Sequence, residues 1–126
     1  GSAEIVGDAA RSGQLGLRLA SDRDDTGTFV VGPRLPVERG LGYRLSWQGR
    51  VSRGGGTNIY LRFLDPNGRE LQRDEGRVNN DKGGGWAPGQ LDAVPPAGAA
   101  FVDIVIQRPG FRPFPYTVDI DDLELA

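Results

Sequence analysis

The chain has 126 residues, of which 37% are hydrophobic and 25% are charged, and its formal net charge is -2. This length suits one domain with a single core, and the small net charge gives no global attraction to nucleic acid or to an anionic membrane. The sequence contains no Cys, His or Met, which excludes disulfides, a Cys/His zinc site and a serine–histidine triad. We therefore expect residues 1–126 to form a single domain. The first two residues, Gly1 and Ser2, are typical of a cloning scar.

Apolar side chains recur with a period of two along the chain, at residues 15–19, 43–48, 58–63, 102–107 and 118–125. This period predicts half-buried β-strands, and the frequent Gly and Pro residues leave no room for long helices. Residues 65–68, Asp-Pro-Asn-Gly, predict a tight hairpin turn, and the pair Asp121-Asp122 interrupts the last strand as a β-bulge would. We expect an all-β fold, a jelly-roll β-sandwich of two antiparallel sheets with roughly eight strands.

The outward positions of these strands supply a candidate sugar-binding face. If the strands are neighbours in one sheet, that face carries Gln48, Arg50, Tyr60, Arg62 and Gln107. An aromatic ring covers the apolar face of a sugar, while amide and guanidinium groups bond to its hydroxyls. Two arginines also suit a carboxylated or sulfated glycan, so the choice between a neutral and an acidic glycan stays open. The alternative is an ordinary solvated strand face.

The remaining aromatic residues have separate interpretations. Trp47 shares the phase of Tyr43 and Leu45, which predicts a core position. Trp86 follows three glycines and either stacks on a sugar or plugs the core. Tyr116 ends a proline-rich segment, 111–116, which either presents aromatic rings to a ligand or forms a lid on the core.

Catalysis is not expected, because no histidine is present and the acidic residues lie mostly in turns and loops. A calcium site is a second possibility, since Asp121 and the acidic loop of Asp22, Asp24 and Asp25 offer hard oxygen ligands. The alternative is a capped or bulged strand beside a solvated loop.

Several segments, in their order along the chain, resemble the galactose-binding-like carbohydrate-binding modules. Residues 9–19 are similar to the family's "a-x-s-G-x-x-s-L-x-L" strand, and residues 37–46 resemble its "V-x-x-G-x-x-Y-x-l-S" strand. The family's hairpin and closing pattern are matched by residues 63–68, Trp86, residues 95–99 and residues 120–125.

The resemblance implies a non-catalytic module that binds a polysaccharide or oligosaccharide, without nucleic acid or membrane partners. It further implies a monomeric module of a secreted or extracellular multidomain protein, such as a glycoside hydrolase or a polysaccharide lyase. The family's structural calcium would take Asp121 as a ligand, although Glu4 does not match the family's "N-x-x-F-E" glutamate. Binding would use either the sheet face of Gln48, Arg50, Tyr60 and Arg62 or the loops around Trp86 and residues 111–116. The alternative function is a structural or protein-interaction domain of a larger extracellular protein.

Overall fold

The computed structural model describes residues 2–6, 16–21, 28–38, 40–54, 56–78, 85–108 and 116–125. Within these residues all regular structure is β-structure, arranged as ten strands, and β1 and β2 are described by their backbone pairing alone. No helix in the described part of the chain is long and apolar enough to cross a membrane. The strands are β1 (Ser2–Val6), β2 (Gly16–Ser21), β3 (Thr28–Val31), β4 (Leu35–Pro36), β5 (Tyr43–Arg53), β6 (Thr57–Leu64), β7 (Glu70–Val78), β8 (Ala87–Ala93), β9 (Phe101–Arg108) and β10 (Tyr116–Leu125).

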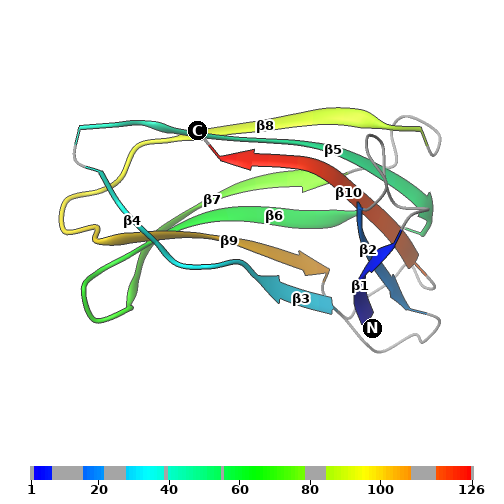
Figure 1. Cartoon of the computed structure of the whole chain (residues 1–126), viewed down its shortest axis with the longest axis horizontal. Coiled ribbons are helices and arrows are strands. Elements are labelled where there is room, and N and C mark those ends of the chain that lie inside the picture. The colour runs from blue at the N-terminus through cyan, green and yellow to red at the C-terminus, as the bar shows by residue number, and fades with distance from the viewer. Residues whose placement is uncertain are drawn as a thin grey trace.

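The strands form two antiparallel sheets, which make the two layers seen in Figure 1. Sheet A has the order β1-β2-β10-β5-β8, and sheet B has the order β3-β9-β6-β7, with β4 paired to β9. The predicted all-β sandwich is confirmed. The described residues hold ten strands rather than roughly eight, partly because the two-residue β4 is too short to show any alternation in the sequence.

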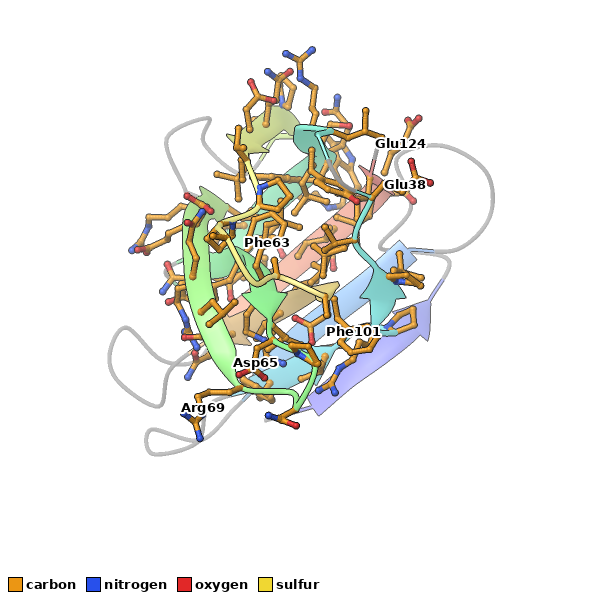
Figure 2. The ribbon with its side chains drawn as sticks, turned by 90° about the vertical axis from the view of Figure 1, so that its left-hand side faces the viewer. Glu38, Phe63, Asp65, Arg69, Phe101 and Glu124 are labelled. Atoms are coloured by element: carbon orange, nitrogen blue, oxygen red, sulfur yellow. The ribbon has the colours of Figure 1, made fainter. Side chains whose placement is uncertain are left out.

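Alternation along the central strands places one set of side chains between the sheets. Along β5 the odd-numbered residues from 45 to 51 are buried, while the even-numbered residues are more exposed. Each fully buried large apolar side chain stabilises the fold by roughly 1.5–3 kcal/mol. Figure 2 views the sandwich from one end and shows Phe63 between the layers. Besides Phe63, the core contains Leu45, Trp47, Val51, Ile59, Leu61, Val102, Ile106, Val118 and Ile120, which confirms the core position predicted for Trp47.

Trp47 fills a space that two glycines leave open. Gly89 of β8 is its cross-strand partner in sheet A, and Gly76 lies on β7 of the opposite sheet. A Cβ atom at Gly76 would lie 2.6 Å from Cη2 of Trp47, and one at Gly89 would overlap the indole ring. The indole therefore packs β8 against β5 and joins the edges of the two sheets.

The hairpin predicted at residues 65–68 is confirmed between β6 and β7. The Gly68 amide donates to the Asp65 carbonyl oxygen at 2.9 Å, and Gly68 has a φ of 82°. Glycine adopts this left-handed conformation at low cost, as a three-residue hairpin loop requires. The Asp65 carboxylate also accepts from the Asn67 and Arg69 amides, both at 2.9 Å. Asp65 and Arg69 mark this turn in Figure 2.

The bulge predicted at Asp121-Asp122 is also present. Asp121 pairs with Gln48 and Glu124 pairs with Ser46, so β10 uses one residue more than β5 over this stretch. The extra residue resets the alternation. As a result, both Asp121 and Glu124 lie beside residues of β5 that face away from the core.

Candidate functional site

The sugar-binding face predicted from the sequence is divided between the two sheets. Gln48 and Arg50 lie on β5 in sheet A, whereas Tyr60 and Arg62 lie on β6 and Gln107 lies on β9, both in sheet B. The prediction that these five residues share one face is therefore wrong. Alternation tells which side chains face outward, but it does not tell which sheet a strand joins.

On the outer face of sheet B, Tyr60 and Arg62 belong to a cross-strand network of ion pairs and ring contacts. Arg62 donates from Nε and Nη2 to the two carboxylate oxygens of Asp103, at 2.9 and 2.7 Å, and the Asp103 side chain is only 2% exposed. Arg73 donates from Nη2 to Glu70 at 2.7 Å, and its guanidinium carbon lies 4.7 Å from the centroid of the Tyr60 ring. The hydrogen bond to Asp103 raises the pKa of Arg62, and the bond to Glu70 raises the pKa of Arg73.

The Tyr60 ring and hydroxyl, which a glycan would contact, already have partners within the protein. One face of the Tyr60 ring is covered by Arg73, and its hydroxyl accepts from Nδ2 of Asn58 at 3.1 Å. Gln107 pairs with Asn58 across β6 and β9 on the same side of the sheet. The charged side chains on the outer face of sheet B are therefore paired with one another, and these pairs stabilise the sheet.

A hollow of about 560 Å³ lies instead on the outer face of sheet A. Its polar wall comes from Ser46 and Gln48 of β5 and from Gln90 of β8, and Trp47 and Gly89 contribute to its lining. Glu124 of β10 closes one side and is labelled beside the end of that strand in Figure 2. The sheet thus presents two primary amides, a hydroxyl and a carboxylate along one shallow trough, which also includes Pro88.

One arginine fixes an aromatic ring near this hollow. Arg50 donates from Nε to Oδ2 of Asp119 at 2.8 Å, and the Asp119 side chain is fully buried. The Arg50 guanidinium carbon also lies 4.7 Å from the centroid of the Trp86 ring, which is half-buried. A cation–π contact of this kind contributes about 0.5–2 kcal/mol. The buried carboxylate therefore orients the arginine, and the arginine orients the indole of Trp86.

Sheet A thus brings together Gln48, Arg50 and Trp86 from the predicted set, with Asp121 as the cross-strand partner of Gln48. Tyr116 begins β10 and its backbone pairs with Ser21 of β2, while the loop residues 111–115 lie outside the described residues.

Sequence reasoning missed Gln90 and Glu124 as functional candidates. Gln90 faces outward because it alternates with Gly89 and Leu91 along β8, and this alternation was available in the sequence. Glu124 reaches the trough only because the bulge shifts the register of β10, and no sequence signal gives the size of that shift.

No protein-family model and no curated protein matches the chain at a significant level. Solved structures do match it. A family 16 carbohydrate-binding module has a TM-score of 0.75 and 14% identity, over 98% of this chain and 84% of that one. The enzymatically active domain of bacteriophage CBA120 tailspike protein 4 has a TM-score of 0.71 and 17% identity, over 89% of this chain and 15% of that one. A family 61 carbohydrate-binding module in complex with β-1,4-galactotriose has a TM-score of 0.62 and 16% identity, over 98% of this chain and 81% of that one.

The chain has the β-sandwich fold of carbohydrate-binding modules. At these identities the likeness concerns the fold, and it confirms the resemblance that the sequence motifs indicated. Of those motifs, residues 37–46 lead into β5 and include its first residues, residues 63–68 end β6 and form the turn to β7, and residues 120–125 end β10.

The calcium site that the resemblance implies has Asp121 as its expected ligand. No group of three or more His, Cys, Asp or Glu residues that could hold a metal occurs in that part of the chain. Asp121 lies on β10 opposite Gln48, whereas Asp22, Asp24 and Asp25 fall outside the described residues. Ca²⁺ takes six to eight oxygen ligands, which can be carboxylates, carbonyl groups or water, and Asp121 as a calcium ligand stays a prediction.

Proposed function

We propose that this chain is a non-catalytic carbohydrate-binding module that binds a polysaccharide in the trough on the outer face of sheet A. The observation that carries the proposal is the trough itself, because Gln48 of β5 and Gln90 of β8 both line it and Trp86 is held nearby by Arg50. Binding sites for small polar ligands are concave and carry a few well-placed polar groups on a rigid scaffold. The β5–β8 pair supplies that scaffold.

The residues of the trough suit sugar chemistry. Each amide offers a donor and an acceptor to neighbouring hydroxyls, and Ser46 adds a hydroxyl of its own. Pro88 offers apolar surface for the C–H face of a pyranose, and the Trp86 ring, one face of which is covered by Arg50, lies half-buried nearby. Arg50 is bonded to Asp119 and stacked on Trp86, so its part in binding is to position the aromatic ring.

Binding without catalysis fits the carboxylates on this face. The glycosidase mechanism needs two carboxyl groups that flank one bond, one as acid and one as base or nucleophile. Asp119 is buried against Arg50 and Asp92 is bonded to Arg44. These two carboxylates are therefore held in ion pairs rather than aimed together at a substrate, while Asp121 and Glu124 are further carboxylates on this face.

The similar structures support a place within a larger extracellular protein. This chain covers 15% of the phage tailspike chain and 21% of an arabinose-bound α-L-arabinofuranosidase chain at a TM-score of 0.61. Domains of this fold therefore occur as parts of longer chains. We propose that this module is likewise part of a longer chain, and that it is monomeric and attached to a secreted enzyme that acts on polysaccharides.

Affinity electrophoresis tests the proposal with matched glutamine variants. The gels contain β-1,4-galactan, xylan or hydroxyethylcellulose, and the proteins are wild type, Gln48→Ala, Gln90→Ala and the control Gln107→Ala. Gln107 is a half-buried glutamine on the outer face of the opposite sheet. We expect at least one glycan to retard the wild type and Gln107→Ala, with each trough variant weakened by up to about tenfold because a hydrogen bond contributes about 0.5–1.5 kcal/mol. Retardation that only Gln107→Ala loses would move the site to sheet B.

A protein-interaction function is the second candidate, and one observation favours it. Phe29 and Val31 lie on the same side of β3, at the edge of sheet B, and their side chains are 58% and 46% exposed. Exposed apolar side chains on an edge strand suit a protein partner. This function predicts no retardation by any glycan and a loss of partner binding in Phe29→Ser.

A further inference from the structure

We propose that a polysaccharide bound in the trough on sheet A extends over the edge of the sheet into a second polar cleft. This cleft binds further neutral sugar units of the same polysaccharide. The inference rests on the proposed function. It adds a second subsite, between β8 and β7, to the trough described above.

The second cleft lies between the edge strands of the two sheets. β8 ends the order of sheet A, and β7 ends the order of sheet B. The cleft has a volume of about 670 Å³, and its polar lining consists of Tyr43, Arg44, Gln72, Asp74 and Asp92. It is therefore open to solvent along the side of the sandwich and has polar groups on both walls.

The trough and the cleft are consecutive along one pair of strands. The cross-strand pairs Gln48–Pro88, Ser46–Gln90 and Arg44–Asp92 follow one another on the outer face of β5 and β8. The first two pairs line the trough, and the third lines the cleft. A hydrogen bond also joins them, because Nε2 of Gln90 donates to Oδ2 of Asp92 at 3.4 Å.

This track is long enough for an extended ligand. Arg44, at the cleft, lies six positions along β5 from Arg50, which is beside Trp86. At about 3.3 Å per residue the distance is about 20 Å. A chain of several sugar units that lies along β5 would thus start at the Trp86 ring and reach the cleft.

The polar side chains that β7 contributes to the cleft lie on the side of the strand that faces the core. Gln72, Asp74, Gly76 and Val78 alternate along one side of β7, and Val78 is buried in the core. Nε2 of Gln72 donates to Oδ2 of Asp74 at 2.8 Å, and this bond fixes both side chains. A carboxylate has about four acceptor positions, of which Gln72 uses one, so Asp74 can accept from sugar hydroxyls as well.

The charges in the cleft define the class of ligand. Asp74 and Asp92 are acidic, and Arg44 is bonded to Asp92 through Nε at 2.8 Å. A carboxylated or sulfated sugar would meet like charge at Asp74. Uncharged sugar units, which donate hydroxyl hydrogens to the carboxylates, match this lining.

Calorimetry with a ladder of oligosaccharides from β-1,4-galactan and from xylan, from the dimer upwards, tests the inference. The variants are Gln72→Ala, Asp74→Ala and the shape-conserving Asp74→Asn. The control is Glu75→Ala, at the next residue of β7, which pairs with Tyr60 and lies on the opposite side of the strand. For the wild type we expect affinity to rise with length until both subsites are filled. Asp74→Ala and Gln72→Ala should lose up to about tenfold for the long oligosaccharides and nothing for the shortest ones that bind.

The outcomes separate this inference from the proposed function. If Gln48→Ala loses binding while the Gln72 and Asp74 variants bind long oligosaccharides as tightly as the wild type, the second subsite is refuted and the trough stands. If the Gln72 and Asp74 variants bind long oligosaccharides as tightly as the wild type but form dimers, the role of Asp74 is to keep the edge strand β7 from pairing with another chain. The second subsite is refuted in that case too. If no oligosaccharide or polysaccharide binds the wild type, the proposed function fails together with it.

Discussion

The packing of Trp47 against Gly89 gives a quantitative prediction about the scaffold of the trough. In Gly89→Ala the new methyl group would overlap the indole of Trp47, which is only 4% exposed and also lies against Gly76 of the other sheet. Overpacking of a well-packed core costs about 1–3 kcal/mol. For a domain of this size each kcal/mol lowers the melting temperature by about 4 °C. We therefore expect Gly89→Ala to melt roughly 4–12 °C below the wild type.

Thermal unfolding followed by circular dichroism and by tryptophan fluorescence measures this effect. Gly42→Ala is the matched control, because its new Cβ atom would meet the Ala93 carbonyl oxygen at 3.8 Å, which is an ordinary contact. A Gly89→Ala protein that melts within about 2 °C of the wild type would refute the packing described for Trp47, since that range is normal for surface substitutions.

Three further predictions concern charge. Neutral glycans should retard the protein while polygalacturonate and dextran sulfate should not, because each arginine of β5 with a described side chain is bonded to a carboxylate and Glu124 adds another negative charge. Arg62→Ala should lower the free energy of unfolding by about 3 kcal/mol, since it leaves the buried Asp103 carboxylate without its cation. Arg44→Ala should raise the pKa of Asp92 towards its ordinary value, because the hydrogen bond from Arg44 is the main cause that lowers it.

Each of these predictions has its own check. Retardation by an acidic glycan that weakens steeply with salt would contradict the first, and a denaturant midpoint unchanged in Arg62→Ala would contradict the second. The third is read from a carboxyl-carbon NMR titration of Asp92. In the wild type the stabilisation from the Arg44–Asp92 pair is present above the ordinary carboxyl pKa and is lost as pH falls through the lowered one. An identical titration curve in Arg44→Ala would refute this account.

Local signals in the sequence predicted the elements well. The alternation at 43–48 and 58–63 corresponds to the buried and exposed sides of β5 and β6 in the structure. The Asp-Pro-Asn-Gly segment forms the turn between β6 and β7. These features depend on residues that are neighbours in the chain, so period and turn chemistry are sufficient to predict them.

The site depended on long-range pairing, which alternation does not encode. β5 and β6 follow each other in sequence and carry Gln48 and Tyr60 on their outward positions, yet they lie in different sheets. A sandwich allows the chain to cross between layers at such a connection. Moreover, β8 contributes Gln90 to the trough from a part of the chain some 40 residues after β5. The predicted face therefore combined residues of two opposite surfaces.

The most direct test of the central claim is an NMR titration of the ¹⁵N-labelled protein with oligosaccharides of β-1,4-galactan and of xylan. If the trough on sheet A is the glycan site, the backbone amides of Ser46, Gln48 and Gln90 and the indole of Trp86 should show the largest chemical-shift changes. Shifts that cluster instead on β6 and β9 of sheet B, or the absence of any shift with either ladder, would contradict the claim.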